Sequence, residues 1–182
     1  MIAHILGLGQ SLIYHEPDGN FTIGVNDIFR YRKTHCIVFV DLPRVFTPER
    51  LKVIIESKPL QFITLFPEWK NYFGDKTLII KKAPGSGDMK LLRSENYVCS
   101  NNSTFVATVH AFKCGYSKII LHGVDLKNHH ALSRERTFKK AMAHFKELSA
   151  EFKKYGVTLY VGNAYSALSE FLPVYRTGSA PA

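Results

Sequence analysis

The sequence predicts a three-layer α/β/α sandwich in which a mostly parallel, Rossmann-like sheet lies between helices. Two observations indicate this fold class. Short apolar, β-branched segments alternate along the chain with segments of helical periodicity, as they do in βαβ units. Several of the expected strands are also continuously apolar, which is typical of parallel strands that are covered on both faces. A length of 182 residues suits one domain with a sizeable core.

The expected strands are short runs rich in Ile, Val, Leu and Phe, most of them bounded by polar residues, glycine or proline. In chain order they are Ile2–Leu6, Phe21–Val25, Cys36–Val40, Gln61–Leu65, Thr77–Ile80, Lys118–Leu121 and Val157–Val161.

Four helices are expected between or after these strands. The first, 48–57, follows Thr47 as N-cap and has proline at its first position. The second, 103–114, has an apolar face and ends at Gly115. The third, 134–155, is the longest, with Ser133 as a candidate cap, and a short helix over 165–171 follows the last strand. The expected inner stripe of the third helix is Phe138, Met142, Phe145, Leu148 and Phe152.

We expect residues 1–175 to form a single nucleotide-binding domain. Residues 66–96 are rich in Pro, Gly and charge, and we interpret them as a mobile loop or a small lid. Trp69 lies in this segment, where core or lid packing is the expected role of its ring. The final residues, 176–182, are interpreted as a disordered tail or a remnant of cloning.

The cysteines indicate a reducing compartment. Cys36, Cys99 and Cys114 have no framework spacing, and we expect reduced thiols, with Cys36 and Cys114 in the core. No signal peptide or membrane-spanning run is evident, so we expect a cytoplasmic protein. The formal net charge of +9 favours anionic partners such as nucleotides, phosphates, nucleic acid or, by weak surface association, anionic lipid.

Polar residues follow several of the strands where ligands bind in open α/β sheets, beyond the carboxyl ends. The first loop reads "GLGQS", which lacks both GxGxxG and the Walker A lysine, so it is either a plain turn or an anion-binding loop. Asn26 and Asp27 end the second strand, where an Asx turn is the alternative to a ligand contact. Asp41 follows the third strand.

Two further segments carry candidate binding or catalytic groups. "SNNST" places Asn101, Asn102, Ser103 and Thr104 at a helix start, where capping explains one or two of them and the others can meet a phosphate. "LHGVDLKNHH" follows the sixth strand and contains His129 and His130, which titrate near neutrality and can deprotonate a hydroxyl. A solvated basic loop is the alternative, and we assign no metal site here because adjacent histidines splay apart.

Five segments together resemble a known family: "ILGLGQSL", "TIGVND", "VFVDLP", "SNNSTFVATVHAFKCGYSKIILHGVDL" and "LYVGNAYSAL". This set is similar to the bacterial sialyltransferases of glycosyltransferase family 42 and to the related MptE-like proteins. The run "GYSKIILHGVDL" carries most of the resemblance, which spans most of residues 2–172. Two departures are visible: the first loop lacks the usual proline, and residues 126–133 are shorter than the family's lid and contain no tyrosine.

The resemblance implies a metal-independent site for a CMP-activated sugar. It implies that Gly7, Gly9, Gln10 and Ser11 border the phosphate, that Ser103, with Asn102, faces it, and that Gly123, Val124 and Asp125 hold cytidine and ribose. It further matches Asn26 to the family's strand-two asparagine and Asp41 to another asparagine position. His130 or His129 would replace the family's catalytic histidine.

Three functions follow as hypotheses. The first is a sialyltransferase-like glycosyltransferase that acts on a glycan acceptor without a cofactor. The second is MptE-like pyrophosphoryl transfer to a pterin alcohol, with ATP, Mg²⁺ and Asp41 or Asp125 as metal carboxylates. The third is a non-catalytic module that binds nucleotides or nucleic acid, which the charge and the short histidine loop favour.

Overall fold

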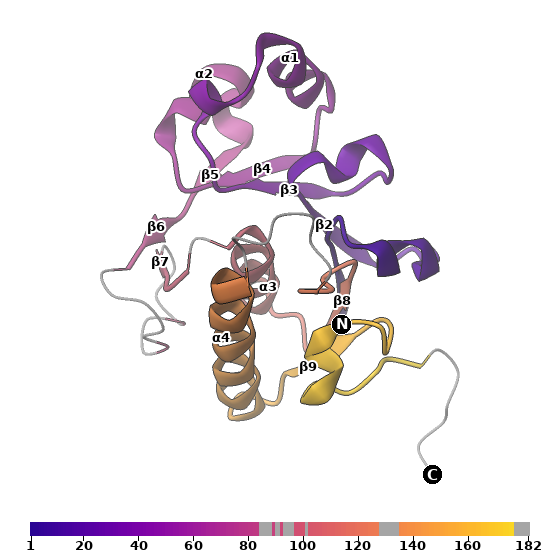
Figure 1. Cartoon of the computed structure of the whole chain (residues 1–182). Helices are drawn as coiled ribbons and strands as arrows, with labels where there is room; N and C mark the ends of the chain where they lie inside the picture. Colours follow the sequence, from indigo (N-terminus) through magenta and orange to yellow (C-terminus); the bar gives the residue numbers. More distant parts are fainter. Residues whose placement is uncertain (84–88, 90–91, 93–96, 101, 128–134, 177–182) are drawn as a thin grey trace.

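A parallel sheet forms the centre of the molecule (Figure 1). The computed structural model describes residues 1–83, 89, 92, 97–100, 102–127 and 135–176. Within these residues, seven strands pair in the order β5-β4-β3-β2-β1-β8-β9. Their bounds are β1 (Ile2–Leu6), β2 (Phe21–Val25), β3 (Cys36–Phe39), β4 (Gln61–Thr64), β5 (Thr77–Ile79), β8 (Lys118–His122) and β9 (Thr158–Val161). The predicted fold class is confirmed, and each predicted strand agrees with an observed one to within one residue at either end.

The α-helices are α1 (Pro48–Glu56), α2 (Lys70–Phe73), α3 (Ser103–Lys113) and α4 (Glu135–Lys153). The 3₁₀ turns are η1 (Gln10–Tyr14), η2 (Asn26–Arg30), η3 (Pro43–Val45), η4 (Pro67–Trp69), η5 (Gly74–Lys76) and η8 (Ala167–Glu170). Helices α1, α3 and α4 lie where the sequence predicts helices, whereas α2 and most of the 3₁₀ turns were not predicted. Thr47 caps α1 as predicted, by accepting a hydrogen bond from the amide of Arg50. The predicted helix over 165–171 is wrong in type, because Ser166 caps a short 3₁₀ turn there instead.

Helices α3 and α4 cover one face of the sheet (Figure 1). Most of α3 is buried, because it packs against β1, β2, β3 and β8 and its aromatic rings also contact those of α4. Aromatic contacts join the two helices: the Phe112 and Phe152 rings stack with centroids 4.6 Å apart, and those of Phe105 and Phe145 are tilted with centroids 5.7 Å apart. The predicted inner stripe of α4 is therefore confirmed at Phe145, Leu148 and Phe152, which are buried in this core.

The opposite face of the sheet is covered in two parts. Over β3 and β4, α1 and the segment 66–73 enclose an aromatic cluster that includes Phe39, Phe62 and Trp69. The Trp69 side chain is fully buried, and its ring nitrogen donates a hydrogen bond to the carbonyl of Asp41 (2.8 Å). The core packing that we expected for the Trp69 ring is thus observed, and it fixes η4 to the body of the protein at the start of the segment 66–96. Over β1 and β8, η1 and the chain that follows it form the cover.

The rest of the segment interpreted as a lid is described only in part. Two short strands, β6 (Lys81–Lys82) and β7 (Tyr97–Val98), pair in parallel as a separate small sheet. Residues 84–88, 90–91, 93–96 and 101 lie outside the described residues, as do 128–134, which hold the candidate cap Ser133, and the tail 177–182.

The cysteines are free thiols, as predicted. Cys36 and Cys99 are buried, but Cys114 is exposed because it follows the last turn of α3, so its predicted place in the core is wrong. Among the described residues, no helix is both long and apolar enough to cross a bilayer.

Acid is expected to destabilise the fold through His110. This α3 side chain is 6% exposed, and burial, with a smaller effect from Lys113, lowers its pKa from 6.5 to about 4. The unfolded chain therefore binds the proton more readily, so the stabilisation is complete above pH 6.5 and is lost as the pH falls toward 4. This one group should lower the free energy of unfolding by roughly 3 kcal/mol across that range.

Urea unfolding of the wild type and of His110→Gln at pH 7.5 and pH 4.5 tests this expectation. The variant should lose less free energy of unfolding on acidification, with the difference close to the contribution of this one group. An equal loss in both proteins would contradict the role of His110.

Candidate functional site

The main candidate site is a cavity where the direction of strand order reverses. Strands β2 to β5 follow one another outward from one edge of β1. The chain then returns, and β8 pairs with the other edge of β1. In open α/β sheets, ligands bind at the carboxyl ends of the strands at such a point. A cavity of about 340 Å³ lies there, a volume suited to a small ligand. Its lining residues are Gly7, Leu8, Gly9, Gln10, Val25, Asn26, Thr104, Gly123, Val124, Asp125, Leu126, Lys127, Phe138 and Tyr165.

The glycines of the first loop allow the loop after β1 to pack against the loop after β8. The Gly7 amide donates to the carbonyl of His122 and the Gly9 amide to that of Gly123, both at 2.7 Å. A Cβ atom on Gly9 would lie 2.5 Å from a carboxylate oxygen of Asp125 and 2.7 Å from the Gly123 carbonyl oxygen. The amides of Gly7 and Gly9 are therefore already engaged by the neighbouring loop, although both residues line the cavity.

Asp125 and Ser11 fasten the same two loops together. One carboxylate oxygen of Asp125 accepts a hydrogen bond from the Ser11 amide (3.0 Å), and the other accepts one from the Ser11 hydroxyl. The hydroxyl oxygen in turn accepts the Gly123 amide at 3.2 Å. Both side chains are about 95% buried. Both oxygens of this carboxylate are thus engaged within the protein, so the carboxylate positions the loops that line the cavity.

Asn26 lies at the carboxyl end of β2 in a left-handed conformation, with φ of 52°. Asparagine tolerates this region better than most residues, and such backbone strain clusters at functional sites. The Asn26 side chain accepts a hydrogen bond from the Ser103 hydroxyl (3.3 Å), which joins it to the first turn of α3. Asn102 is the cap of α3, through a 3.0 Å bond from the Phe105 amide, and it does not line the cavity. Thr104, one residue beyond Ser103, does line it.

Lys127, Tyr165 and Gln10 form another part of the cavity wall. The Lys127 ammonium lies 4.0 Å from the centre of the Tyr165 ring, and the Tyr165 hydroxyl donates to the side-chain oxygen of Gln10 (2.9 Å). Leu126 has a left-handed φ of 50°, which is rare for a branched residue. In the sequence, Tyr165 belonged to the segment "LYVGNAYSAL" of the family resemblance without a role of its own. Lys127 belonged to the basic segment "LHGVDLKNHH".

Not all of the candidates meet at this cavity. Asp41 is exposed and does not line it, because β3 is separated from β1 by β2 and from β8 by both of these strands. Asp27 pairs instead with Arg50 (3.0 Å) and Arg30 (3.7 Å) in an adjoining pocket of about 550 Å³. His129 and His130 lie outside the described residues.

Comparison with known proteins identifies the fold. The sequence matches no protein-family model and no curated protein sequence. A mutant of the α-2,3/8-sialyltransferase CstII superimposes with a TM-score of 0.63 at 16% identity, over 100% of this chain and 90% of the other. CstII in complex with CMP and a trisaccharide acceptor superimposes with a TM-score of 0.60 at 16% identity, over 100% of this chain and 89% of the other. The monofunctional α-2,3-sialyltransferase Cst-I of Campylobacter jejuni superimposes with a TM-score of 0.59 at 17% identity, over 95% of this chain and 79% of the other. The chain thus shares a sialyltransferase-like fold with proteins of very different sequence.

Proposed function

We propose that the chain is a glycosyltransferase-like enzyme that transfers a sugar from a CMP donor to an acceptor hydroxyl without a catalytic metal. One observation carries this proposal: a ligand-sized cavity lies at the switch point of a sheet whose fold is shared with a sialyltransferase solved with CMP and a trisaccharide acceptor.

The phosphate of the donor would lie near the start of α3. Helix N-termini favour anions through their free amides and the helix dipole, and Thr104 of the first turn of α3 lines the cavity. Asn26, held by Ser103, lies beside this turn. Lys127, which also lines the cavity, would supply a cation, and backbone groups of 123–125 would contact the ribose and cytosine.

The transfer step needs a proton acceptor and a stabilised leaving group. The acceptor oxygen would attack the anomeric carbon, the bond from that carbon to the phosphate oxygen would break, and CMP would leave. His130 or His129 would take the acceptor's proton. The α3 amides and Lys127 would stabilise the charge that develops on the phosphate.

The placement of the carboxylates favours this reaction over pyrophosphoryl transfer. A Mg²⁺-ATP site needs carboxylate oxygens that are directed at the ligand. Asp125 directs both of its oxygens to Ser11, and Asp41 does not line the cavity. In the proposed reaction, the Lys127 ammonium is the cation that contacts the phosphate.

Calorimetric titration with CMP, with AMP as the competing nucleotide, tests the proposal. CMP should bind the wild type, and Lys127→Ala should weaken this binding roughly 10–100-fold, as expected for the loss of one charge-assisted hydrogen bond. Lys52→Ala removes an exposed lysine from α1 and is the matched control that should leave affinity unchanged.

Binding of AMP but not CMP would overturn the cytidine assignment. Tight, salt-dependent binding of an oligonucleotide without CMP binding would instead support a nucleic-acid-binding module.

A further inference from the structure

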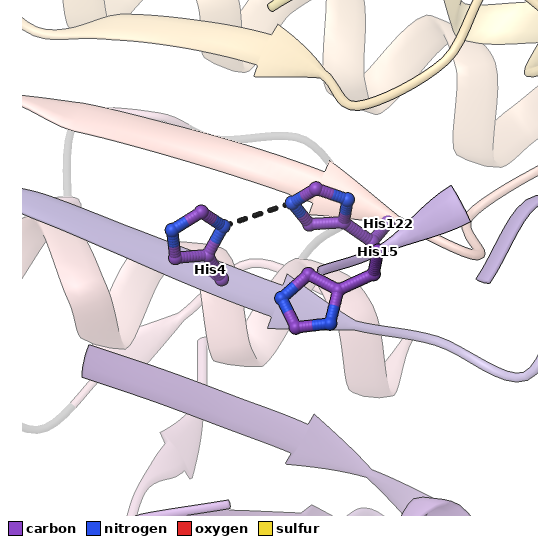
Figure 2. Close-up of side chains that lie close together, drawn as sticks. All are labelled: His4, His15 and His122. Atoms are coloured by element: carbon purple, nitrogen blue, oxygen red, sulfur yellow. Dashed lines mark hydrogen bonds between the residues drawn. The ribbon is translucent and has the colours of Figure 1, made fainter. Parts of the chain in front are cut away.

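Three histidines from distant parts of the chain lie close together (Figure 2). His4 lies in β1, His122 ends β8, and His15 follows η1. In the ladder between β1 and β8, Leu6 is opposite His122, and His4 lies two residues before Leu6. Side chains two residues apart share one face of a strand, so His4 and His122 lie on the face opposite α3 and α4. One ring nitrogen from each histidine lies within 4.8 Å of those of the other two.

The hydrogen bonds of His4 direct one of its nitrogens toward the cluster. Its Nε2 lies 3.1 Å from a carboxylate oxygen of Asp18, and its Nδ1 lies 2.9 Å from His122 Nε2. A proton held on Nε2 by the carboxylate leaves the Nδ1 lone pair facing the other two rings. Carboxylates commonly orient metal-binding histidines in this way.

His15 supplies the observation that points to a missing partner. Its side chain is 4% exposed, and neither ring nitrogen has a hydrogen-bond partner among the residues that the structure describes. Buried polar groups are nearly always satisfied, so an imidazole without any partner calls for an explanation. The His15 ring centre lies 4.5 Å from that of His122 and 5.5 Å from that of His4, so a shared ion would satisfy it.

The charge state of the cluster suits a metal ion. Three imidazoles this close do not all become positively charged, and metals bind the neutral ring. Burial, together with the neighbouring histidines, lowers the pKa of His15 to about 4 and that of His122 to about 3. Burial also lowers the pKa of His4, against the opposing effect of Asp18.

We propose that His4, His15 and His122 form a binding site for a divalent transition-metal ion of the zinc class. His4 Nδ1, His122 Nε2 and one ring nitrogen of His15 would be the ligands, with the fourth position open to water. Zinc binds imidazole nitrogens at roughly 2.0–2.1 Å, which separates tetrahedral ligand atoms by about 3.4 Å. The nitrogens now span distances from 2.9 Å to within 4.8 Å, so small ring shifts would complete the site.

The ion would serve as a structural staple. None of the three histidines lines the cavity, but His122 directly precedes Gly123, and its carbonyl accepts the Gly7 amide (2.7 Å). His15 ends the turn that begins after Gly9, through a 3.0 Å bond from its amide to the Leu12 carbonyl. A metal that joins these residues would hold both loops that line the cavity in place, whichever ligand the cavity binds.

Titration of the untagged, metal-stripped full chain with Co²⁺ and Zn²⁺ tests this inference. The wild type should bind one Co²⁺ per chain with the visible absorption of tetrahedral nitrogen coordination. Zn²⁺ at about 100 times its dissociation constant should raise the midpoint of thermal unfolding by roughly 5–10 °C. A wild type without these absorption bands would overturn the proposal.

The matched variants are His15→Gln and His144→Gln, because each removes one imidazole and only the first belongs to the cluster. His15→Gln should weaken metal binding at least tenfold, whereas His144→Gln should bind as the wild type does. Equal binding by His15→Gln would overturn the proposal. X-ray absorption on the zinc-loaded wild type needs no variant: three imidazole ligands would support the site, and two or fewer would refute it.

Discussion

Gly9→Ala is expected to weaken CMP binding at least 100-fold and to lower the free energy of unfolding by about 1–3 kcal/mol. The backbone at Gly9 has an ordinary φ of −72°, so alanine brings no conformational strain. The cause is contact: the new Cβ would lie 2.5 Å from Asp125 Oδ2 and 2.7 Å from the Gly123 carbonyl oxygen. Relief of this overlap must separate the two loops that form the cavity, and small displacements of binding groups are costly.

Calorimetry with CMP and thermal unfolding measure the two effects separately. Gly19→Ala is the control, because a methyl group added at Gly19 would have nothing within 4 Å, and only the φ of 79° would strain the new residue. It should cost about 1 kcal/mol and leave CMP affinity unchanged. If Gly9→Ala binds CMP as tightly as the Gly19 variant, close packing of the two loops is not what shapes the site.

The role of Gly9 shows where sequence reasoning stops. The sequence indicated a plain turn or an anion-binding loop at "GLGQS", but the segment that packs against it begins more than 100 residues later, at His122. Nothing in local composition reveals which chain packs there. The strands, in contrast, were predictable, because parallel strands buried on both faces read as apolar runs whatever their neighbours are.

Strand order explains which candidate residues come together. Polar residues after strands were predicted to gather at one sheet edge, and Asn26 and Asp125 both line the cavity. Asp41 has the same local pattern but follows β3, which the order of the sheet separates from β8 by two strands. The sequence predicts an edge, whereas only the pairing of strands decides which positions on that edge are neighbours.

The histidine cluster could not be predicted from the sequence. Its members are 11 and 107 residues apart along the chain, without the short spacings by which metal motifs are recognised. His4 and His122 read as polar residues within or beside apolar strands, and His15 as part of a turn. They converge only because β1 and β8 are adjacent and η1 folds back beneath them.

Asp125→Asn is expected to lower the free energy of unfolding by about 2–4 kcal/mol, because it disrupts charge-assisted hydrogen bonds in a buried site. The carboxylate accepts both the amide and the hydroxyl hydrogen of Ser11. An asparagine presents an NH₂ group to one of these two donors, so one bond is lost and two donors face each other. Urea unfolding measures the loss, and Asp75→Asn, at an exposed aspartate of η5, should change stability by less than about 0.5 kcal/mol.

A double-mutant cycle with Ser11→Ala separates the pair from its surroundings. Ser11→Ala keeps the amide bond to Asp125 but removes the hydroxyl that joins the carboxylate to the Gly123 amide (3.2 Å). Since both single changes break the same connection, the double variant should be more stable than their sum predicts, by about 0.5–3 kcal/mol. Strict additivity would mean that the two side chains act independently. Coupling, together with weakened CMP binding in each single variant, would identify this carboxylate as the group that holds the two loops in their binding geometry.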